Sequence, residues 1–462
     1  MKKIILLLIL FTTENIFGQG IGLTNFTDSQ LMSMTGSFLF SSGLMAVGKN
    51  PANIFKYSGS TIELISPLPV PNLSIGIVSN FFTLKDYNFY LGTKIIDSNG
   101  EVYGKNLTRS DKDKLKSIFK SNNNVNTDIS IQLFGIKIQP SNKSGALSFA
   151  MSDRISFSLT FPKSLVELLF DGNQPDKIYN FSDAKFNAWW LRKFSLTYSN
   201  EFNIVKNFKL GVSLNFVNGY FLTAIEKNNT TIKTDSLNII TGFGEFLAYS
   251  AFSSFFNMKY SFDNVFPKPL GNGIGVDLGI ITNISENLAF AFSMTDIGTI
   301  TWKNNIIEYS SNAPIYLDDI SNKKQVDTLI SILTGRANKK YINSLKTNMN
   351  TAIHLGIMWT NKPVDITTSK FDAVFEYHQV LNYQPGITNY SIVFSLDYFW
   401  IKTLYFRTGL SFGEFYKFNW AFGIGFNFKI LEINFATNNF QNVLFPDKTK
   451  GLTFACYSIW KI

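Results

Sequence analysis

The sequence predicts an all-β protein, a transmembrane antiparallel β-barrel of about 14 strands within a range of roughly 12–18. The first observation is the segment 417–428, KFNWAFGIGFNF, where large apolar residues alternate with small or polar ones. Successive side chains of a strand point to opposite faces, so one face would be apolar and the other wet. The second observation is the composition: aromatic residues make up 16% of the chain, yet the mean hydropathy is only +0.05. Apolar and polar positions average out in this way in a barrel.

The same alternation recurs along the chain, and the links between the predicted strands are of two kinds. Ranges with the clearest alternation are 207–216, 272–280, 288–295 and 390–398. Short links lie at 282–286 and at Ile430, and long polar links at 97–127, 163–186, 225–245 and 303–348. Short turns at one rim and long loops at the other are typical of a membrane barrel. Helical periods at 110–120 and 323–335 predict helices in two outer loops, the first capped by Ser110 and Asp111. A soluble sandwich or propeller would not explain faces made of Gly, Ser and Asn.

Three parts of the chain are predicted. Residues 1–19 read as a secretory signal peptide, with a basic start at Lys2 and Lys3 and an apolar run of eight residues, too short to span a membrane. Residues 20–58 precede the barrel, and 59–462 form it. The signal peptide predicts export, and the barrel pattern predicts the outer membrane. An even strand number would place both barrel ends on the periplasmic side.

Charge and cysteine content exclude several kinds of partner and chemistry. The net charge is +9, but nucleic acid is not an expected partner of an exported chain. Cys456 is the only cysteine in the sequence, so no intrachain disulfide can form. We expect a monomer in outer-membrane lipid, without a cofactor.

The aromatic residues suggest a girdle at the membrane interfaces. Seven of them fall near predicted strand ends or on lipid faces: Trp189, Trp190, Tyr398, Trp400, Tyr405, Trp420 and Trp460. Interfacial aromatic rings are typical of membrane barrels.

No catalytic residues and no metal site are predicted from the sequence. GLSFG at 409–413 matches a nucleophile pattern, but Ser411 sits inside an alternating strand and no histidine follows it. We therefore predict that the protein is not an enzyme.

A polar cluster is predicted on the lumenal face of the strands that hold the two histidines. Its members are His354, Asp372, Glu376, His378 and Arg407. Two imidazoles and a carboxylate could bind a metal or act as acid and base, but a solvated charge ladder is the favoured interpretation.

A strand kink is predicted in 129–138, where the apolar phase switches beside Gly135. A β-bulge produces such a switch. It could mark a lateral opening in the barrel wall, or it could be an ordinary bulge.

Two motifs carry a family resemblance. AVGKNPANI, which contains Asn50, Pro51 and Ala52, resembles the NPA segment of the N-terminal hatch in FadL-like outer-membrane transporters of long-chain fatty acids. Residues 271–305 resemble an uncharacterised FadL-like family of Bacteroidota-type envelopes, which is related to the PorV-like protein of type IX secretion. The resemblance implies that 20–58 is a hatch inside the lumen and that Asn50, Pro51 and Ala52 shape it. A purely structural turn is the alternative for these three residues.

The leading functional hypothesis is an outer-membrane channel that passes hydrophobic, fatty-acid-like molecules past a hatch. The alternative is a PorV-like interaction protein whose partners are secretion-system proteins. An outer-membrane lipase is a third class, disfavoured because no Ser/His arrangement is found. The sequence does not identify the ligand, because apolar pockets select weakly among similar chains.

Overall fold

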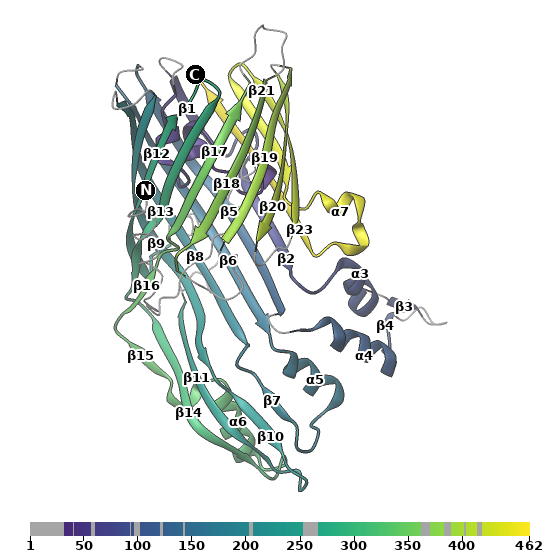
Figure 1. Cartoon of the computed structure of the whole chain (residues 1–462). Helices are drawn as coiled ribbons and strands as arrows, with labels where there is room; N and C mark the ends of the chain where they lie inside the picture. Colours follow the sequence, from purple (N-terminus) through teal and green to yellow (C-terminus); the bar gives the residue numbers. More distant parts are fainter. Residues whose placement is uncertain are drawn as a thin grey trace, which may run out of the picture.

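A closed ring of antiparallel strands dominates the structure, a computed structural model (Figure 1). It describes residues 32–39, 41–56, 61–92, 94–96, 102–120, 123–141, 144–202, 207–252, 267–361, 370–382, 390–401, 403–413 and 418–462. Within these residues the wall has 14 strands, which confirms the predicted all-β barrel. The predicted signal peptide, residues 1–19, lies outside the described residues.

Each wall strand pairs antiparallel with the next, and the first pairs with the last. The wall consists of β1 (Thr61–Ile65) with β2 (Asn72–Ser79) as one interrupted strand, then β5 (Asn123–Gln139), β6 (Ala146–Phe161), β8 (Lys185–Phe202), β9 (Phe208–Asn228), β12 (Gly271–Asn283), β13 (Leu288–Trp302), β17 (Ala352–Thr360), β18 (Lys370–Val380), β19 (Tyr390–Ile401), β20 (Leu404–Gly413), β21 (Asn419–Phe428), β22 (Leu431–Thr437) and β23 (Gly451–Lys461). The ring closes where β23 pairs with both β1 and β2. Closure leaves no sheet edge in the wall.

The alternation of the sequence becomes an apolar outer face and a small or polar inner face. In β12, Gly275 and Asp277 are buried on the lumenal side, whereas Ile274 is 61% exposed on the outer side. In β21, which lies within the predicted segment 417–428, the buried positions include Ala421 and Gly423. An outer face of this kind suits hydrocarbon.

The two rims of the barrel differ. Short turns such as 284–287 and 429–430 lie at one rim, the upper one in Figure 1, where the last residue of the chain also lies. We call this the turn rim and the opposite one the loop rim. No helix in the described part of the chain has the length and apolar character needed to cross a membrane.

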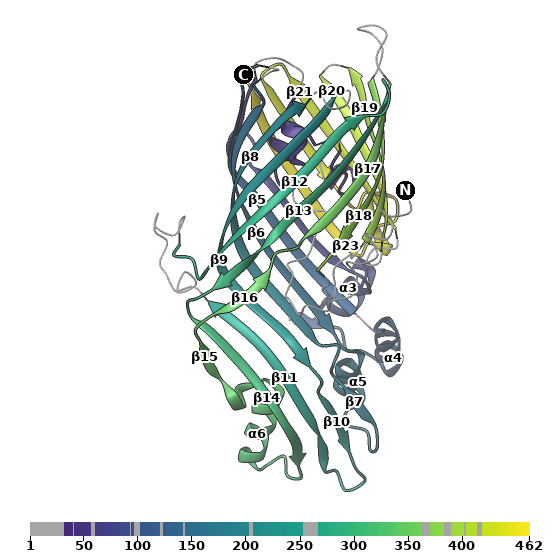
Figure 2. The same cartoon turned by 60° about the vertical axis from the view of Figure 1, so that its left-hand side comes forward.

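Beyond the loop rim, the same sheet continues into a lobe with its own apolar core (Figure 2). The lobe contains the outer end of β9 together with α5 (Lys163–Asp171), β7 (Ile178–Asn180), β10 (Thr231–Thr234), β11 (Ile240–Phe252), β14 (Ile306–Leu317), α6 (Lys323–Leu333), η6 (Arg336–Asn338) and β15 (Lys340–Ile342). β11 pairs with β9, β10 and β14. The ranges 225–245 and 303–348, predicted as long polar links with a helix at 323–335, therefore also contain paired strands, which the sequence did not predict. These strands pack one face against α6 rather than against lipid, so their faces are less sharply divided between apolar and polar.

The remaining elements are short and flank the wall. They are η1 (Gly43–Ala46), η2 (Pro51–Ile54), α3 (Leu84–Tyr87), η3 (Asn88–Gly92), β3 (Lys94–Ile96), β4 (Val102–Gly104), α4 (Arg109–Ile118), β16 (Leu345–Asn348), α7 (Gln441–Leu444) and η7 (Pro446–Lys448). α4 and α6 are the two helices expected at 110–120 and 323–335. The cap of α4 is Thr108, whose Oγ1 accepts a hydrogen bond from the Asp111 N–H at 3.2 Å, rather than Ser110 or Asp111.

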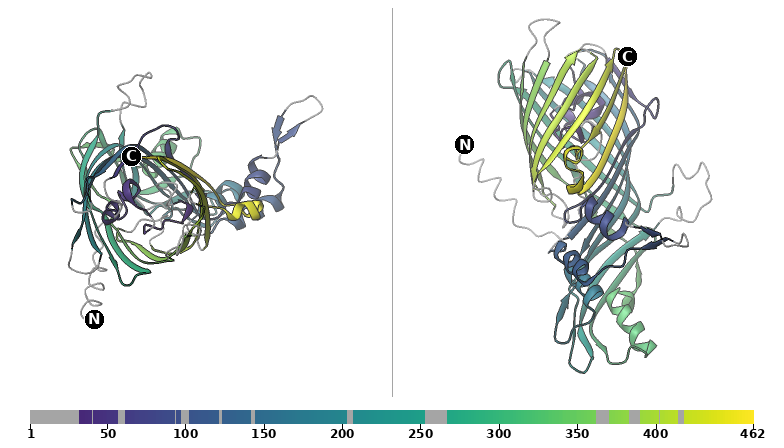
Figure 3. Two further views of the ribbon diagram at one scale, coloured as in Figure 1. Left: turned by 90° about the horizontal axis from the view of Figure 1, so that it is seen from above. Right: turned by 90° about the vertical axis from the view of Figure 1, so that its right-hand side faces the viewer.

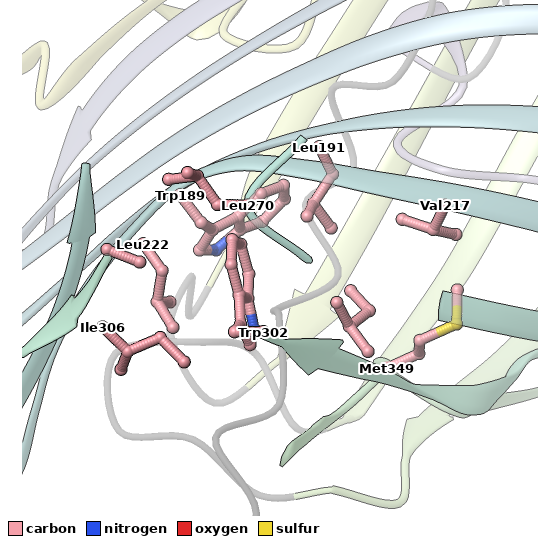
Figure 4. Close-up of a cluster of buried hydrophobic side chains, with 10 residues drawn as sticks. Trp189, Leu191, Val217, Leu222, Leu270, Trp302, Ile306 and Met349 are labelled. Carbon is pink, nitrogen blue, oxygen red and sulfur yellow. The ribbon is translucent and has the colours of Figure 1, made fainter. Parts of the chain in front are cut away.

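A large apolar cluster joins the barrel to the lobe (Figure 4). We call it the Trp302 cluster: Trp189, Leu191, Val217, Leu222, Ala251, Leu270, Ile300, Trp302, Ile306 and Met349. Trp302 is fully buried, and its Nε1 donates to Thr347 Oγ1 at 3.0 Å. The indole lies over Gly219, where an added Cβ would come within 2.4 Å of its ring.

Two members of the expected aromatic girdle point inward instead. Trp189 is 2% exposed within the Trp302 cluster, because Trp189 and Trp190 are adjacent in β8 and take opposite faces. Tyr405 is 1% exposed and shares the lumenal face with Arg407, two residues along the strand. By contrast, Trp400 is 60% exposed on the outer face.

We predict that Trp302→Ala lowers the free energy of unfolding by about 3–5 kcal/mol, since it empties the centre of the Trp302 cluster. Trp400→Ala, which removes an exposed ring, should cost about 1 kcal/mol or less. Urea unfolding of the protein reconstituted in lipid measures both. Equal losses for the two variants would contradict a core at the junction of barrel and lobe.

Candidate functional site

The described residues that precede the first wall strand lie inside the barrel, as the view along the axis shows (Figure 3). We call residues 32–39 and 41–56 the inner segment. Most of its residues are buried, and Ala46, Asn50 and Ala52 are 0% exposed. It contains the short helices η1 and η2.

Asn50, Pro51 and Ala52 form a capped turn against one side of the wall. Asn50 Oδ1 accepts from the Ala52 N–H at 3.1 Å, which caps η2. The turn also bonds the wall, because Ser199 Oγ donates to the Ala52 carbonyl at 3.0 Å. A Cβ at Gly279 would lie 2.1 Å from Asn50 Oδ1, and one at Gly211 would lie 2.2 Å from the Pro51 carbonyl carbon. The glycine faces of β9 and β12 thus provide the space for this turn.

Met34 and Ser33 make the matching contact on the opposite side of the ring. A Cβ at Gly423 in β21 would lie 2.4 Å from Ser33 Cβ, and one at Gly409 in β20 would lie 2.8 Å from the Met34 carbonyl carbon. Six wall strands separate β9 from β21 in either direction around the ring. The inner segment therefore spans the full width of the lumen.

Glu376 of β18 holds the inner segment by three hydrogen bonds. Its carboxylate accepts from Ser37 Oγ at 2.8 Å and from the N–H groups of Phe38 and Leu39, each at 2.9 Å. His378 Nε2 lies 2.9 Å from the same carboxylate. Bonds to a buried charged acceptor are roughly twice as strong as neutral ones.

The predicted polar cluster divides into two groups. His354 lies opposite His378 in the strand register, with ring centroids 4.8 Å apart, and the Phe38 ring packs on both. These two histidines and Glu376 are therefore together.

Asp372 and Arg407 are bound to other partners than the histidines and Glu376. Asp372 pairs with Lys370 at 2.7 Å and accepts from Thr360 Oγ1. Arg407 Nε donates to Asp397 at 3.1 Å, and its Nη1 donates to Asn434 Oδ1 at 3.1 Å. Among the described residues, no group of three or more His, Cys, Asp and Glu side chains is placed to hold a metal ion.

Glu63 of β1 is a second carboxylate that holds the inner segment, and it is not among the site residues predicted from the sequence. It accepts from the Leu44 N–H at 2.8 Å and pairs with Lys56 at 2.6 Å and Lys137 at 3.3 Å. Gly43 has a φ of +63°, and its missing Cβ leaves the space that the carboxylate occupies. One acidic residue within the otherwise uncharged TIELI strand was the available signal.

The first wall strand is interrupted between β1 and β2, and we call residues 66–71 the wall break. Gly135 of β5 pairs with Ile65 and Gln132 with Asn72, so six residues stand opposite the two residues 133–134. The sequence is SPLPVP, and Leu68 is 72% exposed.

Side chains replace the missing strand pairing at the wall break. Trp460 Nε1 donates to the Leu68 carbonyl at 3.1 Å, and Ser458 Oγ donates to the Val70 carbonyl at 2.6 Å. Proline has no N–H, so prolines at every second position remove donors that hydrocarbon could not satisfy.

The predicted kink near Gly135 lies at the wall break. β5 shifts register against β6 between Gln132 and Phe134, as a β-bulge does. Behind the break lies an apolar cluster of Leu44, Met45, Ile65, Tyr457 and Ile459. A Cβ on Gly135 would be 3.5 Å from both Leu44 and Ile65. The inner segment therefore contributes apolar side chains directly behind the interruption.

A family model described as "Family of unknown function (DUF5723)" matches residues 65–438. Among curated proteins, none matches the sequence.

Several solved structures are similar in architecture. The Pseudomonas putida toluene transporter TodX is 13% identical, with 96% of this chain and 97% of that chain covered and a TM-score of 0.40. The Ralstonia pickettii toluene transporter TbuX is 10% identical, with coverages of 97% and 98% and a TM-score of 0.39. A Pseudomonas aeruginosa FadL homologue is 10% identical, with coverages of 96% and 98% and a TM-score of 0.44.

We predict that Glu376→Gln loosens the inner segment, because a neutral amide cannot accept all three hydrogen bonds. Hydrogen-exchange protection of the Phe38 and Leu39 amides should fall roughly ten- to hundredfold, as expected for bonds worth about 1.5–3 kcal/mol. The control is Glu432→Gln, whose carboxylate accepts from Tyr405 and Tyr457 in the wall. Unchanged protection at Phe38 and Leu39 in Glu376→Gln would disprove the anchoring role.

A second prediction concerns the glycine faces. Gly279→Ala should destabilise the protein by about 1–3 kcal/mol, since its methyl group would collide with Asn50. Gly135→Ala should be nearly neutral, because its nearest atoms are 3.4–3.5 Å from the new Cβ. Thermal unfolding in the same detergent compares them, and a Gly279→Ala protein as stable as Gly135→Ala would contradict the close contact.

Proposed function

The chain belongs to the DUF5723 family, and we propose that it is an outer-membrane channel that passes hydrophobic small molecules inward. The observation that carries the proposal is the wall break, because there the strand pairing is interrupted and apolar side chains of the inner segment lie directly behind it. The predicted export signal and the apolar outer face support a location in the outer membrane.

The inner segment is proposed to act as a hatch that obstructs an axial route. It crosses the lumen from β9 to β21 and is held by Glu376 and Glu63 from two further strands. Water and ions are not expected to pass through a lumen that is packed in this way. A hydrophobic molecule is expected to pass more easily, because it can replace the apolar contacts that Leu44 and Met45 make with their neighbours.

The route proposed runs from the loop rim to the wall break. A small displacement of residues 43–46 would uncover the inner side of the wall break beside Gly135 and Ile65. The compound would leave past Leu68 into the membrane, driven only by its concentration gradient.

Gly135→Leu tests this route. The longer side chain would fill the space against Leu44 and Ile65, so we expect uptake of a labelled fatty acid or alkane to fall roughly tenfold, the effect of about 1.4 kcal/mol on a barrier. Uptake is measured in a deletion strain complemented with each variant. The control is Gly104→Leu, because a Cβ at Gly104 meets no described atom within 4 Å.

Two outcomes would reject the proposal. One is full uptake in a folded Gly135→Leu variant, with folding checked by the mobility shift of unheated against heated protein in gels. The other is a deletion strain that takes up hydrophobic compounds normally but loses secretion of cargo proteins, which would favour the PorV-like alternative.

A further inference from the structure

An oblique groove crosses the outer face of the barrel wall, opposite the lumenal face that the inner segment contacts at Gly409 and Val374. Its volume is about 740 Å³. It is lined by Leu288, Ile357, Trp359, Ala373, Val374, Phe375, Phe394, Ser395, Leu396, Thr408, Gly409, Leu410, Phe418 and Trp420. Most of these side chains point outward, since the alternating neighbours Asp372 and Asp397 are buried in the lumen. The groove therefore faces the hydrocarbon of the bilayer.

The shape of the groove follows from side-chain size. Its floor has small residues at Ala373, Thr408 and Gly409, and its sides have large rings such as Phe375 and Phe394. Ala373, Leu396 and Thr408 follow one another across paired strands, so the depression runs across the strands rather than along one.

The chemistry of the lining selects hydrocarbon. The polar atoms of Thr408 and Trp420 satisfy each other, because Trp420 Nε1 donates to Thr408 Oγ1 at 2.9 Å. The Thr408 hydroxyl in turn donates to the Ala421 carbonyl at 2.9 Å. A polar ligand group placed here would lose its water without gaining a partner, which is costly.

The length of the groove suits a lipid chain. From β13 to β21 there are five steps between neighbouring strands, which gives about 24 Å at roughly 4.8 Å per step. At a strand tilt of about 45° the groove descends about 17 Å, a little over half of a hydrocarbon core about 30 Å thick. One acyl chain entering from the loop rim would follow the groove toward Leu288 and Trp359, at the turn-rim ends of β13 and β17.

The end of the groove near the loop rim adjoins a projecting segment, residues 440–448, which we call the rim anchor. The Phe440 ring packs on Trp420 with centroids 5.0 Å apart, and the Phe440 N–H donates to the Trp420 carbonyl at 2.7 Å. Figures 1 and 3 show α7 of the rim anchor beside the barrel and outside its wall.

The rim anchor exposes apolar groups and a cation together. Val443 is 69% exposed and Phe445 56%, and Lys448 Nζ lies 5.6 Å from the Phe445 ring centroid. Apolar side chains on a segment that projects sideways from a membrane barrel meet the interfacial layer of the bilayer. A lysine at this level attracts lipid phosphates.

We propose that the oblique groove and the rim anchor together bind one membrane lipid, with an acyl chain in the groove and a phosphate-bearing head group beside Lys448. A second copy of this chain is a poorer occupant, because a stable protein interface needs about 800 Å² from each partner rather than a narrow groove.

Native mass spectrometry of the full-length protein tests the acyl-chain site after exchange from lipid into detergent. The wild type should retain one lipid, and Ala373→Trp should lower its occupancy at least roughly tenfold by filling the floor. The matched control is Leu452→Trp, at an outer-face position that is 62% exposed and outside the groove. Ala373→Leu should give an intermediate loss, which separates filling of the groove from misfolding.

The head-group site is tested with phosphatidylglycerol and phosphatidylcholine added to delipidated protein. Lys448→Glu should reduce the preference for phosphatidylglycerol roughly fivefold. Lys323→Glu, in the lobe helix α6, should leave it unchanged. Full lipid retention in Ala373→Trp, or a dimer mass in place of a lipid adduct, would overturn the acyl-chain site. An unaltered preference in Lys448→Glu would overturn the head-group assignment.

Discussion

Backbone hydrogen bonding is the constraint on which the structure depends, because hydrocarbon offers no partner to an N–H or a carbonyl. Closure of the ring between the first and last wall strands satisfies the two edges that an open sheet would expose. The wall break obeys the same rule by other means. Three prolines delete donors, and the side chains of Ser458 and Trp460 bond carbonyls that the absent strand would have paired. The interruption therefore exposes fewer unpaired backbone groups to lipid, because prolines lack donors and side chains bond the Leu68 and Val70 carbonyls.

The space inside the barrel is set by residues that lack a side chain. Glycines of β9, β12, β20 and β21 face the lumen at the points where the inner segment touches the wall. The two carboxylates, Glu63 and Glu376, then hold it by accepting backbone N–H groups of the inner segment. Close approach and charge thus act together: the glycines bring the backbone near, and the acidic residues supply acceptors for its unpaired donors.

Much of the barrel could be predicted because lipid and lumen impose opposite requirements on alternate residues. Because of that contrast, β12 and β21 can be predicted from the alternation in the sequence. Prediction from this contrast fails in the lobe, where β11 and β14 pack against α6. It also fails for Trp189 and Tyr405, which were expected at the membrane interface but face inward. The candidate site could be predicted only in part from the sequence, for a similar reason. The register places His354 opposite His378, but the partners of Glu63 and Glu376 lie hundreds of residues away or in an irregular segment without periodicity.

The position of the inner segment at the start of the chain constrains how the protein can assemble. Its contacts reach β20 and β21, which are among the last wall strands to be synthesised. A ring that closed first would have to admit the inner segment through an end already crowded by turns. The wall is instead expected to form around the inner segment, which acts as a template whose glycine contacts check the register of each arriving strand. The same contacts that fill the lumen would then decide whether the last strand meets the first in the correct alignment.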